Sequence, residues 1–141
     1  MLEDQGHYSE AENILRDVAA TRSQVLGPEH PDTLVTRNNL AAVLDSEGKY
    51  AEAEAEDRAV LKLNEKVLGA EHPDTLTTRC DLARVLHKEG KLSEALEFAN
   101  RAQEGYKNVL GEGHPSYKTA HELRKIIQAA LMEKSGSTDP H

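Results

Sequence analysis

The feature that most constrains the fold is an internal repeat with a step of 42 residues. The nine residues 26–34 read LGPEHPDTL, and they return at 68–76 as LGAEHPDTL, with a shorter copy, LGEGHP, at 110–115. The same step relates three glycines outside this motif, Gly6, Gly48 and Gly90. Whole units are therefore repeated. Such a chain buries its apolar surface between stacked neighbours, so the repeat predicts an elongated array.

The residues within each unit predict helices only. Aromatic residues make up 4% of the chain, without Trp, and Ala, Leu and Val at helical spacing favour close helix packing over strands. Pro31 suits the first turn of a helix, and Gly27 suits the position just after a helix end. Ser9 and Glu12 resemble a capping box that opens the first helix. The predicted helices cover 7–25, 31–46, 50–67, 73–88, 92–109 and 115–133.

The repeat also divides the chain. Residues 1–25 are a truncated first repeat, represented mainly by its second helix, and two whole repeats follow at 26–67 and 68–109. Residues 110–133 form a capping helix, because Arg124 and Lys125 stand where the step predicts Leu and Ala, and 134–141 form a disordered polar tail. Residues 1–6 lie one 42-residue step before residues 43–48, where a predicted first helix ends. We therefore expect the chain to begin inside a helix and to be a piece of a longer protein.

The net charge limits the classes of partner that the chain can bind, and the single cysteine limits its cross-links. A net charge of -8 repels phosphate backbones and anionic lipid surfaces, so we expect neither a nucleic-acid nor a membrane partner. Cys80 is the only cysteine, so an internal disulfide is impossible. The sequence contains no apolar run long enough for a membrane span and no signal-peptide pattern. We therefore predict a cytoplasmic chain without a cofactor.

The pattern within the units resembles the tetratricopeptide repeat over about residues 2–130. It consists of a Leu-Ala pair in the first helix, a Gly-Lys turn and a following Glu-Ala pair, at 40–41, 48–49 and 52–53 and again one step later. The 42-residue step and the Leu-Gly-x-x-His-Pro connection are similar to the kinesin-light-chain type. The resemblance implies a right-handed α-solenoid of antiparallel helix pairs whose first helices line a concave groove.

Two repeat positions, one of them represented by two residues, depart from that pattern. Arg37 and Arg79 stand where the family usually has a large apolar residue, on the stripe that packs against the second helix, and Asp57 stands where it favours an aromatic. One interpretation is that these side chains extend to water. The other is an ion pair between Arg37 and either Asp57 or Glu56.

The resemblance and the helical spacing together identify a polar stripe as a candidate peptide-binding groove. Neighbouring Asn amides suit the N–H and C=O groups of an extended peptide, which the resemblance also implies. Arg84 suits a ligand carboxylate, and aspartates suit a basic residue. Any amphipathic helix carries such a stripe, so a purely structural interpretation stays open. Clustered Lys and Arg for a C-terminal carboxylate are absent. The candidate residues are Asn38, Asn39, Asp45, Cys80, Asp81, Arg84 and His87.

Metal binding and catalysis find little support. Three histidines, His30, His72 and His114, recur at the connections, but stacked repeats would separate them by roughly 10 Å. Zn–N bonds are about 2 Å, so we expect structural capping and no metal site. Cys80 and His87 are seven residues apart, two helical turns, which is beyond hydrogen-bond reach. We predict that the chain is not an enzyme.

The sequence thus favours a protein-protein interaction module that binds a peptide or helix of a partner protein in its groove. The alternative is a structural spacer or self-association segment with an unused groove, which would associate through the exposed first repeat.

Overall fold

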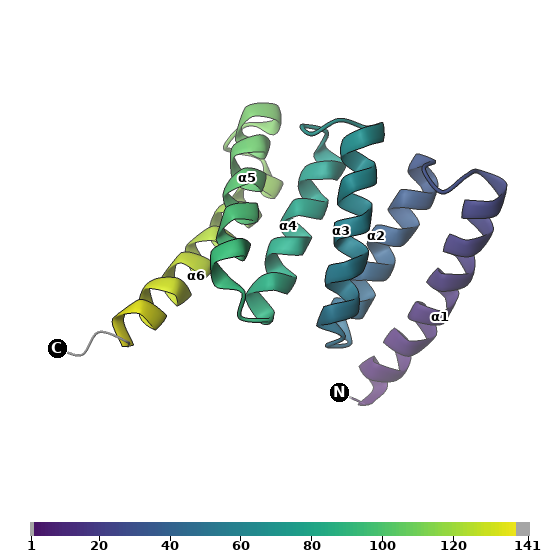
Figure 1. Ribbon diagram of the computed structural model, residues 1–141, viewed down its shortest axis with the longest axis horizontal. Helices are drawn as coiled ribbons and strands as arrows, with labels where there is room; N and C mark the ends of the chain where they lie inside the picture. Colours follow the sequence, from purple (N-terminus) through teal and green to yellow (C-terminus); the bar gives the residue numbers. More distant parts are fainter. Residues whose placement is uncertain (1, 138–141) are drawn as a thin grey trace. The chain divides into compact units, whose positions relative to one another are not determined.

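The computed structural model describes residues 2–137, which form helices joined by short connections (Figure 1). No strand occurs in this range, so the all-α prediction is confirmed. The chain divides into two compact units, Met1–Ala70 with the first three helices and Glu71–His141 with the last three. The helices are α1 Leu2–Val25, α2 Pro31–Ser46, α3 Tyr50–Val67, α4 Pro73–Lys88, α5 Leu92–Leu110 and α6 Pro115–Ser137.

The repeated histidines cap the first helix of each repeat. The ring Nδ1 of His30 accepts the backbone N–H of Asp32 at 3.0 Å, and His72 does the same for Asp74. His114 accepts from Ser116 at 3.0 Å. Each bond satisfies an N–H that the start of a helix leaves unpaired. The capping role expected of the three histidines is therefore confirmed.

The connection before each cap depends on a glycine. Gly27 has a φ of 104°, a left-handed conformation that a side chain would strain, and its N–H donates to the carbonyl of Arg22 at 3.2 Å. The hydroxyl of buried Thr33 donates to the carbonyl of Gly27 at 2.9 Å, which ties the connection to the next helix. The same glycine conformation recurs one and two steps later.

The inner helices keep their predicted bounds. Helices α2, α3 and α4 begin and end where the sequence placed them, and α5 ends one residue later, at Leu110. Helix α6 continues to Ser137 instead of ending at Glu133, so residues 134–137 of the predicted disordered tail are helical. The rest of that tail, 138–141, lies outside the described residues.

The first helix differs from its prediction. Helix α1 begins at Leu2 and runs through Gly6 without a break, so Ser9 lies inside the helix and opens no capping box. Gly48, one step later, has a φ of 82° because the chain turns there between two packed helices. Gly6 has no such pair of helices around it. Continuing the helix adds one backbone hydrogen bond per residue, which offsets the cost of about 1 kcal/mol for a helical glycine.

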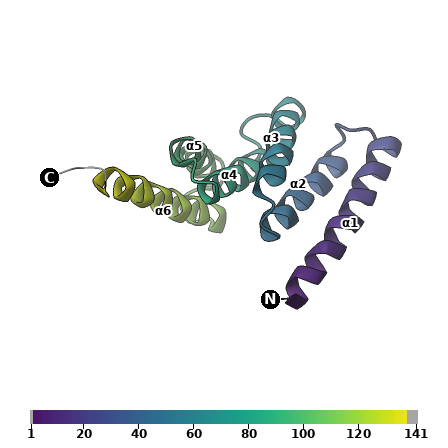
Figure 2. The ribbon, with the colours of Figure 1, turned by 60° about the horizontal axis from the view of Figure 1, so that its bottom comes forward.

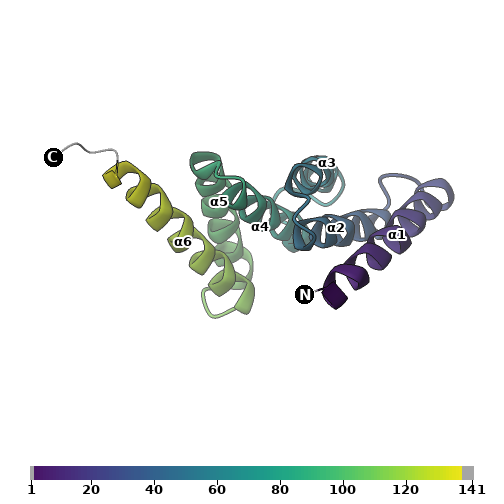
Figure 3. The ribbon, with the colours of Figure 1, turned by 90° about the horizontal axis from the view of Figure 1, so that it is seen from below.

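Each unit has its own buried layer. In the first unit α2 packs against both α1 and α3, and in the second α5 packs against both α4 and α6 (Figures 2 and 3). The apolar residues buried on α2 and α3 are Leu34, Leu40, Ala41, Leu44, Ala53, Val60 and Leu61. Those on α4 and α5 are Leu76, Cys80, Leu82, Ala83, Val85, Leu86, Ala95, Ala99, Ala102 and Tyr106.

Helix α6 buries one side and exposes the other. Ala120, Leu123 and Ile127 are buried, whereas Lys125 is exposed. Arg124 lies at the edge, where its Nε donates to the side-chain oxygen of Gln103 on α5 at 2.7 Å. One side of α6 is thus apolar and buried, and the other is polar and exposed.

Candidate peptide-binding surface

The predicted stripe on α4 contains an ion pair. Arg84 Nη1 donates to Asp81 Oδ1 at 3.0 Å, and both side chains are partly exposed. The two residues are three apart on one helix, the spacing at which side chains meet. A ligand carboxylate would have to compete with Asp81 for the guanidinium. The simple assignment of Arg84 as a carboxylate anchor is therefore weakened.

Cys80 does not lie at the surface of this stripe. Its side chain is 4% exposed, and burial raises the pKa of the thiol to about 11. The thiol is consequently protonated at neutral pH and unsuited to nucleophilic attack. Its predicted place among the ligand-contacting residues is not supported, because neighbouring helices cover a position that spacing alone placed at the rim.

A tyrosine of α5 that the sequence did not identify contacts the same stripe on α4. The hydroxyl of Tyr106 on α5 lies 2.7 Å from the hydroxyl of Thr77, an exposed residue of α4. Burial raises the pKa of Tyr106 to about 12, so the phenol stays neutral. Tyr106 is not among the residues that the sequence identified as candidates. The side chain of Tyr106 is long enough for its hydroxyl to reach Thr77.

His87, another candidate residue, is half-buried in the last turn of α4.

The stripe on α2 carries amides and an apolar patch. Asn39 is exposed, Asn38 and Asp45 are half-buried, and Val35 is 47% exposed. Two adjacent amides can each donate and accept, as an extended peptide backbone requires. Asp45 lies in the last turn of α2, where a basic ligand side chain would find a negative charge.

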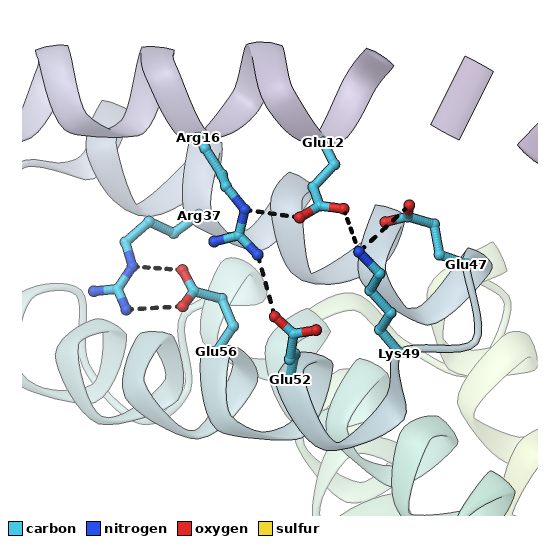
Figure 4. Close-up of polar contacts among 7 residues, drawn as sticks. All are labelled: Glu12, Arg16, Arg37, Glu47, Lys49, Glu52 and Glu56. Carbon is cyan, nitrogen blue, oxygen red and sulfur yellow. Dashed lines mark hydrogen bonds and ion pairs between the residues drawn. The ribbon is translucent and has the colours of Figure 1, made fainter. Parts of the chain in front are cut away.

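The structure shows that Arg37 forms an ion pair and does not simply extend to water. Arg37 Nε donates to Glu56 Oε2 at 2.7 Å and Nη2 donates to Oε1 at 3.2 Å, a two-bond pair between α2 and α3 (Figure 4). The hydrogen bonds that Arg37 donates to Glu56 raise the pKa of Arg37. Of the two proposed partners, Glu56 is the one that forms this pair, whereas Asp57 is buried at 1% exposure.

A second charged group, not anticipated from the sequence, joins α1 to the turn before α3. The buried carboxylate of Glu12 accepts from Arg16 Nε at 2.8 Å and from Lys49 Nζ at 2.9 Å (Figure 4). Arg16 also reaches Glu52 at 3.3 Å. The bonds from Lys49 and Arg16 lower the pKa of Glu12 to about 2. Burial and the nearby Glu12 carboxylate raise the pKa of Glu47.

Two further observations concern metal ions and membranes. Among residues 2–137, no group of three or more His, Cys, Asp or Glu side chains is arranged to hold a metal ion. In the same range, no helix has the length and apolar character needed to cross a membrane.

The repeat pattern is matched by a family model. The model for the tetratricopeptide repeat matches residues 1–58 and 46–108. The chain belongs to the tetratricopeptide repeat family. Members of this family are generally protein-protein interaction modules. No curated protein sequence matches the chain.

Solved structures agree with this assignment. The nearly identical TPR-like repeats of a Podosopora anserina protein assigned as a kinesin light chain are 29% identical, with a TM-score of 0.82 over 94% of this chain and 63% of that one. A variant of that protein gives 28% identity and a TM-score of 0.81, and covers 92% of this chain and 63% of that one. BtubC (BKLC) of P. vanneervenii shares the fold at 21% identity and a TM-score of 0.81, over 92% and 51%. The chain thus spans less than two thirds of each relative.

Proposed function

We propose that this chain binds an extended peptide segment of a partner protein through the first helices of its repeats, α2 and α4. The observation that carries the proposal is the pair of neighbouring amides, Asn38 and Asn39, on a surface that also exposes Val35. The amides suit a peptide backbone, and Val35 offers apolar contact to a side chain. The general role of the family supports this assignment.

The charges favour a basic ligand. The Asp81 carboxylate already neutralises Arg84 within α4, and Asp45 adds a negative charge at the end of α2. The net charge of the chain is -8, which would speed the approach of a cationic segment. The expected peptide therefore presents its backbone to Asn38 and Asn39 and a Lys or Arg to Asp45, all on α2.

Selection from an unbiased displayed peptide library tests the proposal. The wild type, the Asn39→Ala/Asp45→Lys variant and the control Lys62→Ala would be selected in parallel, with circular dichroism to confirm that all three are folded. Lys62 is an exposed residue of α3, the second helix of its repeat. We expect basic peptides to be enriched by the wild type and the control, and lost by the double variant. Enrichment of the same peptides by all three proteins, or of none by the wild type, would contradict the proposal.

A further inference from the structure

The three capping histidines can cap their helices in only one protonation state. In each, the ring Nδ1 lies 3.0 Å from the backbone N–H two residues further on, and it is the acceptor because a peptide N–H can only donate. An Nδ1 atom that accepts has no proton of its own, so the single ring proton is on Nε2. His30, His72 and His114 therefore cap their helices as neutral imidazoles.

Protonation changes this contact in two ways. The proton that an imidazole gains at Nδ1 converts the acceptor into a donor, so Nδ1 and the peptide N–H oppose each other as two donors. The imidazolium also places a positive charge at the N-terminus of a helix, where the helix dipole is already positive. The unfolded chain protonates its histidines without either cost. Acid therefore shifts the equilibrium away from the capped helices in the range where histidines ordinarily titrate, around pH 6.5.

The charged side chains placed around His30 balance one another. Glu29 accepts from Lys66 of α3 at 2.9 Å, so its charge is already neutralised. Asp32, in the first turn of α2, would attract an imidazolium, but it is the N–H of this residue that loses its acceptor. Arg22 of α1 donates to the carbonyl of Asp32 at 3.3 Å and adds a positive charge. The surrounding charges therefore do not replace the lost cap.

The other two caps lie in the second unit and have different charged neighbours. The acidic residues next to His72 in the sequence are Glu71 and Asp74. Next to His114, Glu112 lies 3.6 Å from Lys107 of α5, and the first turn of α6 contains no acidic residue. Two carboxylates thus favour a proton on His72, whereas a proton on His114 has no such support. Of these two caps, that of His114 should lose more stability in acid.

His121 in α6 provides a contrast to the caps. Its Nδ1 lies 3.3 Å from Oε1 of Gln103 on α5, and the same oxygen accepts from Nε of Arg124 at 2.7 Å. A guanidinium N–H can only donate, so this amide atom is the oxygen and Nδ1 of His121 is the donor. Protonation of Nε2 leaves that hydrogen bond intact. His87 lies in the last turn of α4, where a positive charge favours the helix. Neither residue should therefore destabilise the fold in acid.

We propose that the connections before α2, α4 and α6 are acid-sensitive, and that protonation of His30, His72 and His114 releases the first turns of these helices at about pH 6. The same capping bond occurs at each 42-residue step, so the response is of the same kind at every repeat. The first unit contains one such cap and the second contains two. Acid should therefore act on both units.

The two carboxyls with shifted pKa values do not account for a loss of stability in this range. The stabilisation by Glu12, whose pKa is about 2, is lost only below about pH 4.5. The pKa of Glu47 is raised, so the proton that it gains as the pH falls favours folding. A loss of stability between about pH 7.5 and about pH 5.5 is therefore the signature of histidine protonation.

Thermal unfolding at about pH 7.5 and about pH 5.5 tests the proposal on the wild type and two variants. In His30→Asn/His72→Asn/His114→Asn, each side-chain oxygen can accept the same N–H at either pH, because Asn is a preferred capping residue that does not titrate. We expect the Tm of the wild type to fall by about 5 °C or more, and that of the triple variant by less than about half as much. His121→Asn is the control and should show the wild-type fall.

Nitrogen NMR of the imidazole rings tests the same point on the wild type without a substitution. At neutral pH we expect the three capping histidines to have their ring proton on Nε2, and His121 to have its proton on Nδ1. As the pH falls, the resonances of the three capped backbone amides should change in step with protonation of the rings.

Four outcomes would overturn the proposal. They are no fall in the Tm of the wild type, an equal fall in the triple variant, loss of the fall in His121→Asn, and rings that protonate while the capped amides keep their resonances. If the triple variant is unfolded at neutral pH, the ring titration of the wild type decides. No readout involves a peptide, so this proposal and the proposed function can fail separately.

Discussion

The helix pairs α2·α3 and α4·α5 have the same register but are held together by different chemistry. Where the first pair buries Asp57 and Asn64, the second buries Ala99 and Tyr106 one repeat step later. Opposite Arg37 the first pair has Glu56, and the second has Phe98 at that position. The repeat keeps the backbone and its caps, while the second-helix side chains at these positions are polar or charged in α3 and aliphatic or aromatic in α5. The first-helix arginine is present in both pairs, because Arg79, the counterpart of Arg37, is buried on α4.

This difference has an energetic consequence. A buried polar group must recover its lost hydration through hydrogen bonds, whereas buried apolar area is favourable without a specific partner. The second-helix contribution to α2·α3 therefore depends more on particular polar and ionised side chains, and that to α4·α5 depends more on close packing. Changes that alter ionisation should affect the first pair, and changes of volume should affect the second.

The largest effects should come from a leucine that both pairs share, which sets a baseline for the comparison. Leu44 and Leu86 occupy the same repeat position and are 2% and 0% exposed. Replacing either with Ala should lower the free energy of unfolding by about 3 kcal/mol, from lost burial and the cavity left behind. Urea denaturation measures both. A much smaller loss for Leu44→Ala would mean that the first pair is loosely packed, and that polarity is not the difference.

The close approach in the second pair gives the next effect. A Cβ on Gly105 would lie 3.0 Å from Cδ1 of Leu76, which is fully buried. Gly105→Ala should destabilise by about 1–2 kcal/mol, because overpacking outweighs the gain in helix propensity. Gly6→Ala is the matched control: nothing lies within 4 Å of its Cβ, and it should stabilise α1 by up to about 1 kcal/mol. Thermal unfolding that shows a gain for both would contradict the close approach.

The ion pair of the first helix pair should show measurable coupling. Arg37 and Glu56 have side chains that are 26% and 20% exposed, and they share two hydrogen bonds. A double-mutant cycle of Arg37→Met and Glu56→Leu should give a coupling of about 1 kcal/mol. The cycle of Lys62→Met with Glu56→Leu is the control, and it should give none. Equal values in the two cycles would mean that the Arg37 pair contributes nothing specific.

A dependence on pH with opposite signs is expected at two carboxyls. The pKa of Glu12 is lowered to about 2, so its stabilisation is present above about pH 4.5 and is lost as pH falls toward 2. The pKa of Glu47 is raised, so ionising it opposes folding as pH rises. At pH 7 Glu12→Gln should lower the stability of the first unit and Glu47→Gln should raise it slightly. Urea midpoints at pH 7 and pH 3 check both signs, and a shared sign would refute this assignment.

The fold was predictable from the sequence because its signals are local and repeated. Pro31 and His30 mark a helix start, Gly27 marks a helix end, and the same signals recur at the next unit. The prediction failed at Gly6, because a glycine permits a turn but does not require one. Whether the helix breaks there depends on the helices packed around it.

The candidate site was less predictable, since it depends on side-chain reach and on the exact rotation of each helix. Glu56 and Asp57 were equally plausible partners for Arg37 by spacing, and the structure pairs it with Glu56. Cys80 lies next to the stripe, but its neighbours cover it. Glu12 and Lys49 are 37 residues apart in sequence, so their contact follows only from the packing of α1 on the turn before α3.

Hydrogen exchange measured by mass spectrometry gives the most direct test of the difference between the two helix pairs. Exchange of the wild type would be compared with Glu56→Gln and with Glu97→Gln, an exposed control on α5. Local opening is reported separately for each segment, because different parts of a protein open as separate cooperative units. We predict that Glu56→Gln accelerates exchange several-fold in α2 and α3 and leaves α4 and α5 unchanged. Equal acceleration in both pairs, or none in either, would show that the ion pair does not hold α2 to α3.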